Sequence, residues 1–126
     1  MPNALCLTFM PFRSSDSILP LTPISFEILL ALTEGDRHGY AILQQVEART
    51  GGVLPLRTGT LYRALARLEE AGLILLVDGP ETDDERRRYY RITARGRDVA
   101  REEAKRLEDQ VAAARARKLL SGSNEP

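Results

Sequence analysis

The chain has 126 residues, 43% of them hydrophobic and 29% charged, and its 18 Lys and Arg residues balance 18 Asp and Glu residues. These values are typical of one globular domain, whereas a net charge of zero is unlike that of most nucleic-acid-binding proteins. The single cysteine, Cys6, and the single histidine, His38, exclude an intrachain disulfide and a Cys/His metal cage. We therefore expect no metal site and no cofactor.

Residues 1–20 are expected to form an N-terminal extension. The apolar stretch at residues 4–10 follows no basic residue, is cut short by Pro11, and is far shorter than a membrane span of roughly 20 residues. We therefore expect neither a secretory signal nor a membrane segment, and a cytoplasmic protein. The extension is interpreted as disordered, as packed on a partner, or as the product of a misassigned translation start.

Two helices are expected after this extension. Thr22 supplies an N-cap hydroxyl and Pro23 the first helical position, and apolar residues then recur at helical spacing until Gly35. After a turn at residues 36–37, a second helix is expected at about residues 38–50, where two glycines follow it. The inner face of this second helix is expected to consist of Tyr40, Leu43 and Val46.

A third helix and a hairpin follow. Three leucines form one apolar stripe of the third helix, which is expected to end at Gly72. Residues 73–77 and 88–92 have the pattern of two strands, with a long charged loop between them. The stripe on the third helix consists of Leu61, Leu65 and Leu68.

The last predicted element is a long helix that follows Thr93, an expected N-cap, and covers residues 94–118. Residues 119–126 are expected to be a flexible tail. The fold class is therefore mainly α with a small β-hairpin: a winged helix-turn-helix over residues 21–93, followed by a long C-terminal dimerisation helix. The narrow stripe of that helix expected to pack against the partner, here called the seam, has residues that recur at intervals of four and three. It consists of Ala100, Ala104, Leu107, Val111 and Ala114.

The charges of the chain are segregated, which revives the nucleic-acid interpretation that the neutral total disfavours. Basic residues without acidic neighbours occupy the third helix and the returning strand of the hairpin. In a winged helix the third helix enters the major groove, and the wing reaches the flanking backbone or the minor groove. The DNA-binding residues expected on this basis are Arg57 and Thr58 just before the third helix, Thr60, Tyr62, Arg63 and Arg67 on it, and Arg86, Arg87 and Arg88 on the wing.

Other interpretations of the same residues stay open. Arginines on a helix face are often merely solvated, and the wing arginines could neutralise the acidic residues just before them. The alanine-rich seam could pack on its own domain, and the basic face could bind an acidic protein partner instead of DNA. An enzyme is disfavoured, because the sequence offers no nucleophile–base pair, no phosphate-binding glycine loop and no metal cluster.

Four segments together resemble the PadR family of transcriptional regulators, in the order and spacing of that family. They are LTPISFEILLAL at residues 21–32, HGYAI at residues 38–42, GTLYRALARLEEAGLI at residues 59–74 and RRRYYRITARGR at residues 86–97. The resemblance implies a winged helix that binds double-stranded DNA as a homodimer and mostly represses nearby genes. It also places His38 and Tyr40 in a second-helix motif, where a role at the DNA backbone is implied.

Some family members release DNA when a small aromatic or hydrophobic molecule binds. The resemblance therefore suggests a small-molecule effector but does not identify it. This chain has no Trp to stack against a flat ligand, which disfavours an aromatic pocket. Small alanines also bury little area along the seam. We therefore expect the first helix of the partner, through residues such as Phe26, to share the dimer interface.

Overall fold

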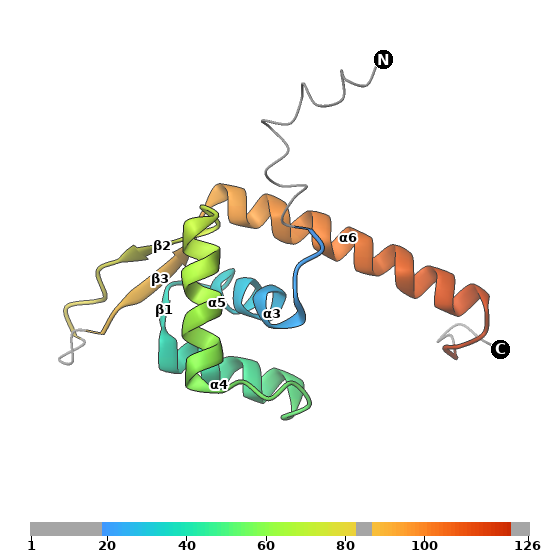
Figure 1. Ribbon diagram of the computed structural model, residues 1–126, viewed down its shortest axis with the longest axis horizontal. Coiled ribbons are helices and arrows are strands. Elements are labelled where there is room, and N and C mark those ends of the chain that lie inside the picture. The colour runs from blue at the N-terminus through green and yellow to red at the C-terminus, as the bar shows by residue number, and fades with distance from the viewer. Residues whose placement is uncertain (1–18, 83–86, 122–126) are drawn as a thin grey trace, which may run out of the picture.

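A computed structural model of the chain describes residues 19–82 and 87–121. Three helices form its body (Figure 1): α3 at Pro23–Leu32, α4 at Gly39–Thr50 and α5 at Thr58–Glu70. The predicted cap of the first helix is confirmed, because the Thr22 hydroxyl accepts a hydrogen bond from the Ser25 N–H at 3.1 Å. That helix ends three residues before the predicted limit, since Thr33 already caps it.

A three-stranded antiparallel sheet packs beside the helices. Its strands are β1 at Arg37–His38, β2 at Ile74–Val77 and β3 at Tyr89–Ile92, and β3 lies in the middle. The predicted hairpin is confirmed as β2 and β3. Strand β1 was not predicted; the sequence indicated a turn and a helix start there, because a two-residue strand is too short to show an alternating pattern.

The core lies where α3, α4, α5 and the sheet meet. The predicted leucine stripe of α5 is confirmed, with each of its three leucines at most 4% exposed. The predicted inner face of α4 is wrong at Tyr40, whose side chain is 62% exposed, whereas Ile42 is fully buried. The reason is the phase of the helix: Ile42 and Val46 lie four residues apart on the buried face, and Tyr40 points away from it.

Helix α6 at Ala94–Ala116 begins against the hairpin and then leaves the body of the molecule (Figure 1). Its predicted cap is confirmed, since the Thr93 hydroxyl accepts the Gly96 N–H at 2.9 Å. Gly96 has no room for a side chain, because a Cβ there would overlap the Leu73 carbonyl. All buried residues of α6 lie in its first ten positions, so its C-terminal half extends past the other helices. No helix in the described part of the chain is both long and apolar enough to cross a membrane.

Candidate nucleic-acid interface

The N-terminus of α5 is exposed and has no side-chain cap. Arg57 occupies the N-cap position, but its side chain makes no capping hydrogen bond, and Thr58 and Gly59 are exposed. A Cβ at Gly59 would lie 3.6 Å from Arg63 Nη1, so the Arg63 guanidinium lies over the first turn. Free backbone N–H groups, the positive end of the helix dipole and this guanidinium together favour an anion.

The outward face of α5 is narrower than the sequence indicated. Arg63 and Arg67 are exposed as expected, but Thr60 is half-buried. Arg67 lines a hollow beside residues 20–25, on one flank of the helix. Tyr62 lies on the opposite flank. Arg63 and Arg67 lie four residues apart and therefore share the outward face of α5.

Tyr62 is 46% exposed and packs on α4. A Cβ at Gly39 would lie only 2.9 Å from Tyr62 Cζ, so the ring covers this glycine. Burial and the neighbouring Tyr62 raise the pKa of Tyr90, and a hydrogen bond from Arg88 opposes this shift. Tyr62 thus packs α5 against α4.

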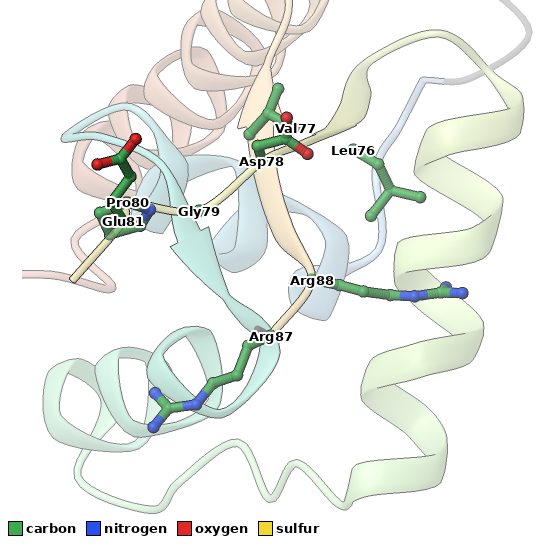
Figure 2. Close-up of a pocket in the computed structure, with 8 residues that line it drawn as sticks. All are labelled: Leu76, Val77, Asp78, Gly79, Pro80, Glu81, Arg87 and Arg88. Carbon is green, nitrogen blue, oxygen red and sulfur yellow. The ribbon is translucent and has the colours of Figure 1, made fainter. Parts of the chain in front are cut away.

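The two described arginines of the wing diverge, as Figure 2 shows: Arg88 points toward α5, and Arg87 points toward the start of α4. Between the hairpin arms lies a hollow that both arginines line together with Asp78 and Glu81. Because carboxylates share this hollow, it is not a purely cationic site. Arg86, the third predicted wing residue, lies outside the described residues.

His38 connects the wing to α4. Its Nδ1 atom accepts the Ala41 N–H at 3.2 Å, and its Nε2 atom lies 2.6 Å from Arg87 Nη1. The Tyr89 ring meets the imidazole edge to face, with centroids 5.3 Å apart. A guanidinium can only donate, and a neutral imidazole accepts at one ring nitrogen only, so the Ala41 N–H and Arg87 compete for the acceptor of His38. The exposed Tyr40 lies two residues along the chain.

The residues predicted for dimerisation divide into two groups. Ala100 is 8% exposed and belongs to the core of its own domain, as one of the open interpretations proposed for the seam. Beyond it, Ala104 and Val111 are exposed, and Leu107 and Ala114 are half-buried. Phe26 is partly buried against the core and, together with Ala100 and Ala104, lines a groove between α3 and α6.

Glu103 is a buried charge that the sequence analysis did not identify. Its side chain is 2% exposed and accepts hydrogen bonds from Arg106 Nε at 3.0 Å and Arg106 Nη2 at 2.6 Å. The Leu21 N–H also donates to Glu103 Oε1, at 3.3 Å. The Arg106 hydrogen bonds hold the pKa of this carboxyl below its ordinary value, although burial opposes the shift. The sequence did offer one signal for its burial, since Glu103 lies between Ala100 and Leu107 along the predicted seam.

Solved structures similar to this chain are transcriptional regulators. A transcriptional regulator from Clostridium thermocellum is 34% identical, with a TM-score of 0.64 over 74% of this chain and 87% of that one. A PadR family transcription regulator from Clostridium difficile R20291 is 29% identical, with a TM-score of 0.66 over 75% of this chain and 97% of that one. Bacillus subtilis PadR in complex with operator DNA is 20% identical and shares the fold, with a TM-score of 0.56 over 64% of this chain and 47% of that one.

Two curated relatives are each 39% identical, and the chain matches less than two thirds of the length of either. Uncharacterized protein X of Lysinibacillus sphaericus aligns over 56% of this chain and 64% of its own length. The uncharacterized 37.1 kDa protein in transposon TN4556 of Streptomyces fradiae aligns over 61% of this chain and 21% of its own length. Residues 28–102 match the Transcriptional regulator PadR-like family. Since this match covers more than half of the chain and agrees with the winged-helix fold, the protein belongs to the PadR-like family of transcriptional regulators.

Proposed function

We propose that this chain is a sequence-specific DNA-binding regulator, and more specifically a repressor that binds an inverted-repeat operator as a homodimer. The observation that carries the proposal is the exposed, uncapped N-terminus of α5 with Arg63 lying over its first turn. A helix end of this kind suits the major groove, where its first residues lie nearest the base edges. Bacillus subtilis PadR, which has the same fold, was solved in complex with operator DNA, and this supports DNA as the partner of this chain.

The residues have distinct proposed roles. Arg63 reads a guanine edge, which a guanidinium can contact through two hydrogen bonds. Arg57 and Thr58 bind phosphate at the helix end, and Thr60, Tyr62 and Arg67 border the contact on the two flanks of α5. The wing supplies Arg86, Arg87 and Arg88 to the flanking backbone or minor groove, and His38 and Tyr40 bind the backbone beside them.

The homodimer is proposed to form along the exposed part of α6. Leu107, Val111 and Ala114 continue the seam in the C-terminal half of α6, which has no fully buried residue among those described. The groove that Phe26 lines between α3 and α6 offers a second area for the partner helix. Two such subunits would place their α5 helices about one turn of DNA apart, in successive major grooves.

A salt series tests DNA binding directly. Fluorescence anisotropy with the DNA upstream of the protein's own gene should show an affinity that falls steeply as salt rises, because phosphate contacts release counterions. Arg63→Ala should lower the affinity for the operator by about tenfold or more while sparing unrelated DNA. Arg87→Ala should weaken binding to all sequences alike and reduce the salt slope by about one.

Lys105→Ala is the matched control, since Lys105 is an exposed cation on α6, outside the proposed interface. It should leave both the affinity and the salt slope unchanged. A chain that fails to bind its upstream DNA at low salt, or that loses equal affinity with Lys105→Ala and Arg63→Ala, would contradict the proposal.

A further inference from the structure

A small pocket opens between the segment that leads into α3 and the C-terminal half of α5. Its volume is about 270 Å³. At the roughly 30 Å³ that one water molecule occupies in the liquid, this is room for roughly nine non-hydrogen atoms. Its apolar walls are aliphatic and consist of Pro20, Leu21, Leu68 and Ala71.

Three polar residues complete the lining: Thr22, Ser25 and Arg67. The Thr22 hydroxyl already accepts the Ser25 N–H, and Ser25 as a whole is 5% exposed. Among the described residues, none makes a hydrogen bond with the Ser25 hydroxyl, which leaves it available to a ligand. Arg67 is exposed and has no ion pair with any described residue. A donor hydroxyl and a guanidinium therefore meet at one pocket whose remaining walls are hydrocarbon.

This combination defines the chemistry of an occupant. A carboxylate matches the guanidinium fork and can accept from a hydroxyl at the same time. Neither an aromatic ring nor an acidic side chain lines the described walls, so the rest of the ligand is aliphatic and uncharged. We infer that the pocket binds a short aliphatic monocarboxylate, with Arg67 and Ser25 holding the carboxylate and the aliphatic walls enclosing the chain.

Such a ligand would act on the proposed DNA contact, so this regulatory step rests on the proposed function. Arg67 belongs to α5, and a bound carboxylate neutralises a cation that would otherwise favour the phosphate backbone. The opposite wall of the pocket is linked to α6, because the Leu21 N–H donates a hydrogen bond to Glu103 of that helix. By linkage, a carboxylate that weakens DNA binding must itself be bound less tightly in the DNA complex.

Hexanoate, with eight non-hydrogen atoms, is the probe. Titrating it into the free, full-length protein should shift the amide NMR signals of Leu21, Ser25 and Ala71, with a Kd of about 1 mM or tighter. Hexanamide, which has the same shape without the charge, should bind about tenfold more weakly. Equal shifts from the two compounds, or shifts spread evenly over the surface, would overturn the carboxylate site.

Two charge-matched variants localise the effect. Arg67→Gln should weaken hexanoate binding about tenfold, whereas Arg63→Gln, one turn earlier on the same helix, should not change it. Ala71→Leu should also abolish binding by filling the pocket while keeping both polar groups. Equal loss with Arg67→Gln and Arg63→Gln would mean non-specific attraction and would overturn the assignment.

The outcomes separate the pocket from the DNA proposal. If the protein binds its upstream DNA and hexanoate does not bind, the pocket assignment fails and the proposed function stands. If hexanoate binds the free protein with the expected variant pattern but leaves DNA affinity unchanged, the site stands and the regulatory step is wrong.

Discussion

At Gly39 the backbone of α4 approaches α5 so closely that the Tyr62 ring occupies the place of a side chain. The glycine is therefore required by packing and not by its backbone angles. Tyr62 also contributes to the raised pKa of Tyr90 in the sheet, although burial is the larger cause. The relative position of α4 and α5 depends on the pair of Gly39 and Tyr62.

Gly39→Ala should lower the free energy of unfolding by about 1 kcal/mol, because the new methyl group displaces the outer end of the half-exposed Tyr62 ring. Urea denaturation measures the change. The double variant Gly39→Ala/Tyr62→Ala should be less destabilised than the sum of the two single variants, as expected for residues in direct contact. Additive effects would show that the contact does not limit this position.

Glu103 is the second informative single residue. Its depressed pKa means that its ionised form stabilises the fold at pH values above its ordinary pKa of 4.5. That stabilisation is lost as the pH falls through the lower, folded-state pKa. Glu103→Gln should therefore lower the free energy of unfolding by about 2 kcal/mol near pH 7, and the difference from the wild type should shrink below about pH 4.5.

Urea denaturation at several pH values tests this expectation, with Glu102→Gln as the control because Glu102 is the exposed neighbour. The control should leave stability nearly unchanged across the range. If Glu103→Gln is as neutral as Glu102→Gln at pH 7, the hydrogen bonds to Arg106 and to the Leu21 N–H contribute nothing measurable.

Between elements, the junction of β1, β3 and α4 at His38 has two separable functions. The Nδ1 atom caps α4, and the Nε2 atom faces Arg87 of the wing. His38→Ala removes both and should lower the free energy of unfolding by about 1 kcal/mol, the usual value of an N-cap. His38→Asn supplies another cap acceptor but removes the Nε2 atom that faces Arg87.

Thermal unfolding and the salt slope of DNA binding together resolve the two functions. We expect both variants to reduce the salt slope by about one contact and only His38→Ala to reduce stability. A His38→Asn variant with the wild-type salt slope would show that His38 only caps the helix.

The elements differ in how well the sequence predicted them. Thr22, Thr93 and the glycines after the helices are local signals, and the element ends that they indicate agree with the structure to within a few residues. Strand β1 carries no local signal, because Arg37 and His38 are a strand only by pairing with Tyr90 and Tyr89. The exposure of Tyr40 was likewise mispredicted, since several apolar residues of α4 compete for its buried face.

For the whole molecule, the sequence analysis predicted the order of the elements and the fold class correctly. It could not find the contact between Leu21 and Glu103, which are 82 residues apart. It also placed Thr60 on the same outward face as Arg63 and Arg67, whereas Thr60 is half-buried, because the width of the buried face of α5 depends on what packs against it. The pattern of residue types along the sequence identifies the helices and strands. Which of their surfaces are buried depends on contacts between elements, and these contacts are seen only in the structure.

The proposed assembly is tested by the thermal midpoint. If the folded protein is a dimer, its Tm rises with protein concentration, because association stabilises the folded state by mass action. Val111→Glu places a charge on the seam and should abolish that dependence and give a monomer by analytical ultracentrifugation. Ala112→Glu, on an exposed neighbouring position off the seam, is the control and should preserve both. A concentration-independent Tm in the wild type would contradict the dimer.

The extension of α6 beyond the body has a consequence for hydrogen exchange. Residues 104–116 include no fully buried side chain, and an isolated helical segment of this length is marginal in water. Their amides should therefore exchange rapidly whenever a subunit is alone and become protected only in the complete assembly. The exchange rate of this half-helix reports the fraction of associated subunits, independently of whether DNA is present.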